Sequence, residues 1–223
     1  MHLQKIETAH EVLKKYISDE LKIKIFSEID KGYKIVEKIL NDNEWTNSAL
    51  TENIKTQLCS FVVEFMFERA IKLGLIKDLK CEIAFNPKRT HRHLKLATLD
   101  DRFIFTISQV KNKNDIPRKS EFRLNYSYTN QLSFDDISGI NRVQKQGYLI
   151  ITHGYFREGL KFINVGMPSS DLKSWIAKFS LLEDPHILKE LEKSKYTVEE
   201  ISDDLILEVK QEFKKRVLED DKA

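Results

Sequence analysis

The chain has 223 residues, and its 37 lysines and arginines against 35 aspartates and glutamates give a formal net charge of +2. Hydrophobic residues make up 41% and charged residues 32%, which is typical of a folded globular protein and argues against a disordered one. No apolar run approaches the roughly 20 residues of a membrane span. The first residues lack the pattern of an export signal, and the two cysteines, Cys59 and Cys81, form no CxxC pair. We therefore expect a cytoplasmic protein with reduced thiols and no membrane contact.

Charge is divided unevenly along the chain. Residues 77–145 contain 14 basic and 8 acidic residues, whereas residues 183–223 contain 8 basic and 13 acidic residues. A basic middle can bind polyanions and an acidic tail can bind a basic partner, although both are also what solvated sheet and helix faces look like.

Apolar residues recur at helical spacing through the first forty residues, which predicts two helices there. A longer helical pattern runs from Leu50 to Met66, with Asn47 or Ser48 as its expected N-cap and Gly74 as its expected end. Its apolar stripe is wide and aromatic, so we expect this helix in the centre of the core.

From about residue 80 to 166 the pattern changes to alternation of apolar and polar residues, as in strands. The segment HLKLATLDDRFIFTISQV fits a hairpin that turns at Asp100 and Asp101 and places Leu96 opposite Phe105. Further strands are predicted at 122–128, 147–153 and 160–166.

Helical spacing returns at the C-terminal side. We expect a helix over residues 168–179 that Ser169 or Ser170 caps, a short helix from Pro185, and a last helix that Thr197 and Glu200 begin with capping-box spacing.

The order of these segments predicts an α+β protein with N-terminal helices, a central mostly antiparallel β-sheet and C-terminal helices. We expect a single compact α+β domain over residues 1–223, with a helical part at about 1–75, the sheet at about 80–166 and C-terminal helices at about 170–220. Neither GxGxxG after a strand nor GxxxxGK[ST] occurs, which argues against the usual dinucleotide and P-loop sites.

Two histidines lie one residue apart on the predicted hairpin. Its register places His91, His93 and Lys95 on the face opposite the leucines, which predicts a solvated position for the histidines. They could ligate zinc if His153 supplied a third ligand, but an HxH pair without a diagnostic third ligand is more often solvated. We predict no metal site and no cofactor.

Catalytic motifs are weak. Asp100 or Asp101 followed by Gln109, Val110 and Lys111 looks like the metal-binding motif of the restriction-endonuclease-like superfamily only if glutamine replaces its second acid. Ser170 and Lys173 have the spacing of a serine activated by lysine, but the serine is better explained as a helix cap. We predict no catalytic residue and keep a metal-dependent nuclease as an alternative.

Basic residues gather on the predicted hairpin and on the loop and strand that follow it. Such a surface can neutralise phosphates and release their counterions. We therefore predict a non-enzymatic binding protein whose basic sheet surface contacts nucleic acid or another acidic partner, and we assign this surface to Lys88, Arg89, His91, Arg92, His93, Lys95, Arg102, Lys111, Lys113, Arg118, Lys119 and Arg123.

A second alternative is a protein-interaction or inhibitor module that docks its acidic C-terminal helix on a basic protein partner. The lysine- and asparagine-rich composition resembles that of small proteins of AT-rich bacteria and their phages or prophages, a likeness that covers the whole chain and includes no diagnostic motif.

Overall fold

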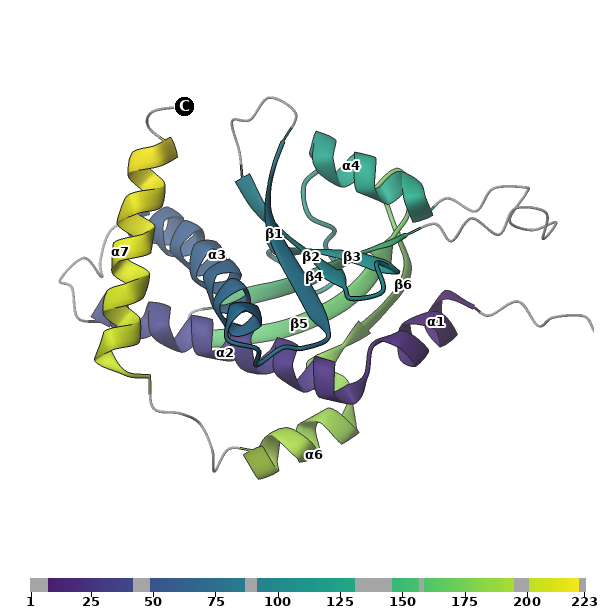
Figure 1. Cartoon of the computed structure of the whole chain (residues 1–223), viewed down its shortest axis with the longest axis horizontal. Helices are drawn as coiled ribbons and strands as arrows, with labels where there is room; N and C mark the ends of the chain where they lie inside the picture. The colour runs from purple at the N-terminus through teal and green to yellow at the C-terminus, as the bar shows by residue number, and fades with distance from the viewer. Residues whose placement is uncertain are drawn as a thin grey trace, which may run out of the picture.

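A computed structural model describes residues 8–41, 49–86, 92–130, 146–156, 159–194 and 201–220. Helices precede and follow a sheet (Figure 1), as predicted. The helices are α1 (Ala9–Tyr16), α2 (Asp19–Asn41), α3 (Ala49–Lys72), α4 (Glu121–Ser127), α6 (Pro185–Ser194) and α7 (Asp203–Asp220). The strands are β1 (Leu79–Phe85), β2 (Arg92–Thr98), β3 (Phe103–Gln109), β4 (Gly147–Phe156), β5 (Gly159–Pro168) and β6 (Trp175–Ser180).

The described strands form one sheet in the order β1-β2-β3-β4-β5-β6. All neighbours are antiparallel except β3 and β4, which run parallel. Parallel neighbours require a crossover connection, and the chain between these two strands carries α4. The prediction of a mostly antiparallel sheet is confirmed, and so is the hairpin register, because Leu96 pairs with Phe105.

The two faces of the sheet are covered differently. The main core packs one face, including Leu96 and Phe105, against α1, α2, α3 and α7. A smaller cluster packs Ile104 and Tyr148 of the other face against Leu124 of α4. Figure 1 shows α4 on the opposite side of the strands from α2 and α3. Near the start of β2, His93 stacks on Phe122 of α4 and Leu94 belongs to the main core, so this end of the strand lies between two layers of helix.

The helix ends follow local chemistry. Thr8 and Glu11 form a capping box at the start of α1, and Gly74, with a φ of +71°, ends α3 as predicted. The caps predicted at Asn47 or Ser48 and at Thr197 with Glu200 lie outside the described residues. Across the described ranges, none of the helices is both long enough and apolar enough to cross a bilayer.

The strand predicted at 122–128 is wrong, because this segment forms α4 and a short 3-10 turn. Phe122 and Tyr126 are four residues apart, so they share one side of a helix, and both rings lie near His93 of the sheet. In a segment this short, the apolar residues fit both the two-residue period of a strand and the 3.6-residue period of a helix. The crossover between parallel strands decides in favour of the helix.

The helix predicted at 168–179 is also wrong. The hydroxyl of Ser169 accepts hydrogen bonds from the backbone N–H groups of Lys173 and Ser174, at 3.2 and 3.1 Å, which closes a turn. Leu172 in this turn has a φ of 56°. The chain then enters β6, so the sheet extends past residue 166 and the described C-terminal helices begin only at Pro185.

Candidate anion-binding cavity

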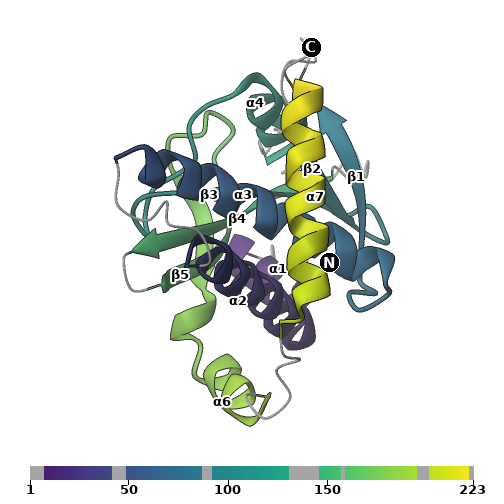
Figure 2. The same ribbon diagram turned by 90° about the vertical axis from the view of Figure 1, so that its left-hand side faces the viewer.

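A cavity of about 590 Å³ opens at the end of the sheet where β2 begins and β3 ends. Its walls come from α3, the two strands, the segment from Pro117 to Arg123, and α7. Figure 2 shows α7 crossing α3 on this side of the molecule. The volume lies in the range of small-ligand pockets. The charged lining residues are Glu64, Arg92, Arg118, Arg123 and Arg216, and the hydroxyl-bearing ones are Thr56, Ser60, Thr106 and Ser108.

Arg123 on α4 is a partly buried cation in the wall of the cavity. Its guanidinium donates hydrogen bonds to the Ser108 hydroxyl and to the Arg118 carbonyl oxygen, both at 2.9 Å. Its Nε is buried without a hydrogen-bond partner among the described residues. Burial lowers the pKa of Arg123, opposed by the nearby Tyr148 and Glu64. Within the described ranges no carboxylate lies within 4.0 Å of it, so the groups that accept its hydrogen bonds are neutral.

Glu64 and Arg216 form an ion pair between α3 and α7. Arg216 donates to the Oε2 atom of Glu64 at 3.3 Å, and the two side chains are 14% and 20% exposed. Burial raises the pKa of Glu64, opposed by Arg216, by a backbone hydrogen bond from Leu94 and by Arg123. The pair also lines a smaller cavity of about 80 Å³, which shares Phe61 and Arg92 with the larger one.

His93 lies in the wall of the cavity and is buried, whereas the sequence predicted a solvated side chain. Its residue is only 4% exposed, and its ring stacks on Phe122 with a centroid distance of 3.8 Å. The predicted face is correct and the predicted solvation is wrong, because α4 covers this side of β2.

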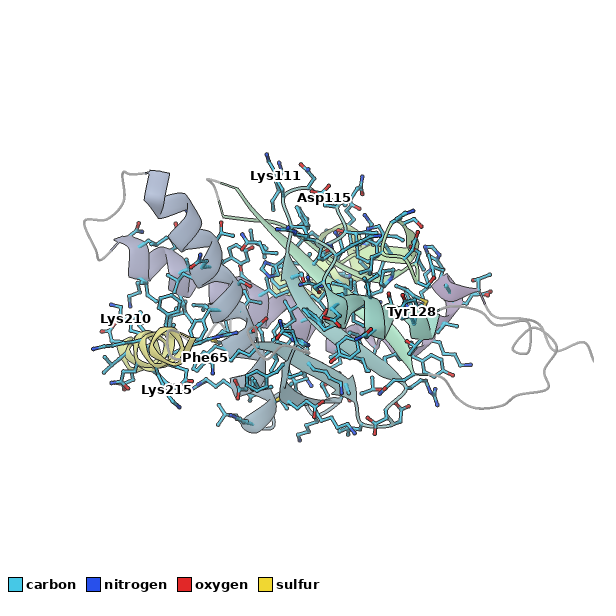
Figure 3. The ribbon with its side chains drawn as sticks, turned by 90° about the horizontal axis from the view of Figure 1, so that it is seen from above. Phe65, Lys111, Asp115, Tyr128, Lys210 and Lys215 are labelled. Carbon is cyan, nitrogen blue, oxygen red and sulfur yellow. The ribbon has the colours of Figure 1, made fainter. Side chains whose placement is uncertain are left out.

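The cavity gathers four of the residues that the sequence assigned to a basic surface: Arg92, His93, Arg118 and Arg123. Lys111 is exposed beside a neighbouring shallow cavity that Arg118 also lines, and Figure 3 shows Lys111 and Asp115 pointing outward. Lys119 is exposed as well.

Other members of the predicted surface lie away from the cavity and have acidic or aromatic partners. Lys95 pairs with Glu82 at 2.6 Å, Lys113 pairs with Glu183, and Arg102 lies 4.1 Å from the centre of the Tyr16 ring, near the other end of β3. Lys88, Arg89 and His91 lie outside the described residues. The predicted residues therefore do not form one continuous patch in the described part of the chain.

The residues considered for metal chemistry are not brought together. His93 stacks on α4, whereas His153 bonds to Tyr33 of α2 on the other face of the sheet. Asp100 and Asp101 precede β3, whereas Gln109 ends it. Among the described residues, no group of three or more histidine, cysteine or acidic side chains is arranged to hold a metal ion.

Two residues of the cavity, Glu64 and Arg216, are not among the residues predicted from the sequence. Glu64 gives a detectable signal, because it is the only charge in the apolar run FVVEFMF. Arg216 gives none, because it is one of several cations near the end of α7. Figure 3 shows Phe65 of the same apolar run lying beside α7.

Comparison of the chain with family models, curated proteins and solved structures finds no significant match. Function is therefore inferred from the chemistry of the cavity itself.

Proposed function

We propose that the chain is a non-enzymatic binding protein that holds nucleic acid by its phosphate groups, with the arginines of the cavity as the main contacts. The observation that carries the proposal is Arg123, whose partly buried guanidinium is held by a hydroxyl and a carbonyl oxygen and has no carboxylate within 4.0 Å among the described residues. Phosphate is a strong acceptor for such a group, because charged hydrogen bonds to guanidinium are about twice as strong as neutral ones.

The charge balance of the cavity supports an anionic ligand. Four arginines face one described carboxylate, Glu64, which already pairs with Arg216. Arg118 and Lys111 extend the positive charge outward along the loop, where a backbone could leave the cavity. Both cysteines are free, in agreement with a cytoplasmic location.

The acidic-helix alternative receives less support. Asp203 and Glu208 of α7 pair with Lys38 and Arg69 of the same chain, at 2.8 and 3.2 Å. Two acidic side chains of α7 therefore already face cations of α2 and α3 in the same chain.

We expect fluorescence anisotropy to detect binding of short single-stranded DNA or RNA, with affinity that falls as salt rises. Arg118→Glu should weaken binding at least about tenfold and lower the salt slope by roughly 1, because one phosphate contact is lost. Arg118 is exposed and contributes its carbonyl, not its side chain, to Arg123, so the variant should fold.

Lys189→Glu is the matched control, since Lys189 is exposed on α6 and outside the cavity. It makes the same change in net charge and should bind like the original protein. No binding at low salt, or equal weakening by the two substitutions, would remove the cavity from consideration.

A further inference from the structure

The ion pair of Glu64 and Arg216 presents an acceptor and a donor side by side in the cavity wall. The two side chains meet at 3.3 Å, yet each keeps some exposed surface, and both line the larger and the smaller cavity. A carboxylate has about four acceptor positions. Arg216 and the Leu94 backbone account for two of those of Glu64, so acceptor capacity remains for a ligand.

This arrangement matches one base edge particularly well. The Watson–Crick edge of guanine carries an acceptor, O6, next to two donors, N1–H and the N2 amino group. Arg216 can donate to O6 while Glu64 accepts from both donors. Uracil and thymine offer a single donor between two acceptors, and inosine lacks the amino group, so each leaves an acceptor of Glu64 unused.

Another acceptor lies elsewhere in the wall of the cavity. The Oε1 atom of Gln109, at the end of β3, is buried with no hydrogen-bond partner among the described residues. Buried acceptors without partners are rare in folded proteins. This atom adds a further acceptor for a ligand that carries N–H groups, on the strand next to Arg92 and His93.

Stacking on the aromatic rings contributes little to recognition here. His93 covers one face of Phe122, and Arg123 lies 4.8 Å from the centre of that ring. Phe61 is in contact with Phe65, Phe213 and Arg216. Because these faces are occupied, discrimination between bases must come from hydrogen bonds to their edges.

We propose that the cavity binds an unpaired guanine nucleotide, with its phosphate on Arg118 and Arg123 and its Watson–Crick edge on Arg216 and Glu64. The inference rests on the proposed binding of nucleic acid and specifies which base enters. The base must be unpaired, because pairing with cytosine uses the same edge. Double-stranded nucleic acid therefore binds only through its backbone.

The test compares two single-stranded oligonucleotides that are identical except for one central guanine or inosine, which differ only by the N2 amino group. Anisotropy titrations of the unaltered protein should show about tenfold tighter binding of the guanine probe, the effect of losing one good hydrogen bond to a charged group. Annealing the complementary strand should abolish this difference.

Glu64→Gln supplies a second measurement, because the amide keeps the shape of the side chain while replacing one acceptor with a donor. The guanine preference should then disappear while salt-dependent binding remains. If this variant does not fold, the comparison of guanine with inosine still decides.

Equal, salt-sensitive binding of both probes would overturn the guanine inference and leave the proposed nucleic-acid function standing. Absence of binding by either probe would overturn both.

Discussion

His153 is a buried titratable group from which we expect a loss of stability at acid pH. Its Nδ1 atom lies 2.7 Å from the Tyr33 hydroxyl oxygen, and burial lowers the pKa of His153 from 6.5 to about 3. At pH values between about 3 and 6.5, His153 is protonated in the unfolded chain but stays neutral in the folded chain. The stabilisation by the neutral ring is therefore complete above pH 6.5 and is lost as pH falls toward 3, at roughly 1.4 kcal/mol per pH unit.

We expect the double variant Tyr33→Phe with His153→Leu to lose this part of the acid sensitivity. Both polar partners are removed together, so neither is left buried alone. Urea unfolding of both proteins at several pH values between about 7 and about 5 measures the difference, and other groups titrate alike in each. Tyr33→Phe alone is the control and should keep the acid sensitivity. A double variant as acid-sensitive as the original protein would contradict the assignment.

The face on which a residue lies could be predicted from the sequence better than the groups that surround it. Alternation along β2 correctly places His93 opposite the leucines, because strand geometry is local. Its burial depends on α4, which packs from another part of the chain, so alternation could not reveal it. Glu64 shows the opposite case, since a lone charge inside an apolar run marks a residue whose surroundings are unusual.

The connection between β3 and α4 is fixed to the sheet by Asn164 of β5. This fully buried side chain donates to the Lys113 carbonyl oxygen at 2.9 Å and to the Thr152 hydroxyl at 3.3 Å. Asn164→Ala should lower the free energy of unfolding by about 1–3 kcal/mol, because buried polar groups lose their donor. It should also weaken nucleic-acid binding, because the same connection carries Arg118.

Chemical denaturation and anisotropy titrations measure the two effects. Asn125→Ala is the matched control, because Asn125 is exposed on α4, and its free energy of unfolding should change by no more than about 0.5 kcal/mol. The role given to Asn164 is wrong if the two alanine variants are equally stable.

At the scale of elements, most segments were predicted with the correct type and two were exchanged between helix and strand. The pattern from Leu50 to Met66 extends over several turns, so only a helix satisfies it. In contrast, α4 and β6 are short, and their types are set by distant partners. The ring of Trp175 on β6 covers Gly166 of β5. A Cβ atom added to this glycine would come within 2.6 Å of the ring. Pairing with β5 thus outweighs the helical spacing of this segment.

For the whole molecule, the order of helices and strands could be predicted from the sequence, whereas the position of the cavity could not. Helices, sheet and helices follow from changes of period along the chain. The cavity does not, because α3, β2, α4 and α7 are separate segments of the sequence that meet only in the folded protein. The basic residues were visible in advance, whereas the ion pair between α3 and α7 required the assembled fold.

Hydrogen exchange tests the cavity at the scale of the whole chain. Saturation with a single-stranded oligonucleotide should slow exchange most in α3 near Glu64, in the segment from Pro117 to Arg123, and in α7 near Arg216, because these parts line the cavity. Ligand binding also stabilises the folded state globally, which slows amides that exchange only on complete unfolding. Fast-exchanging amides therefore provide the decisive signal. The exchange of fast-exchanging amides in α6 should not change. At the same oligonucleotide concentration, Arg118→Glu should reduce the protection near the cavity. Protection centred on α6 would place the ligand elsewhere.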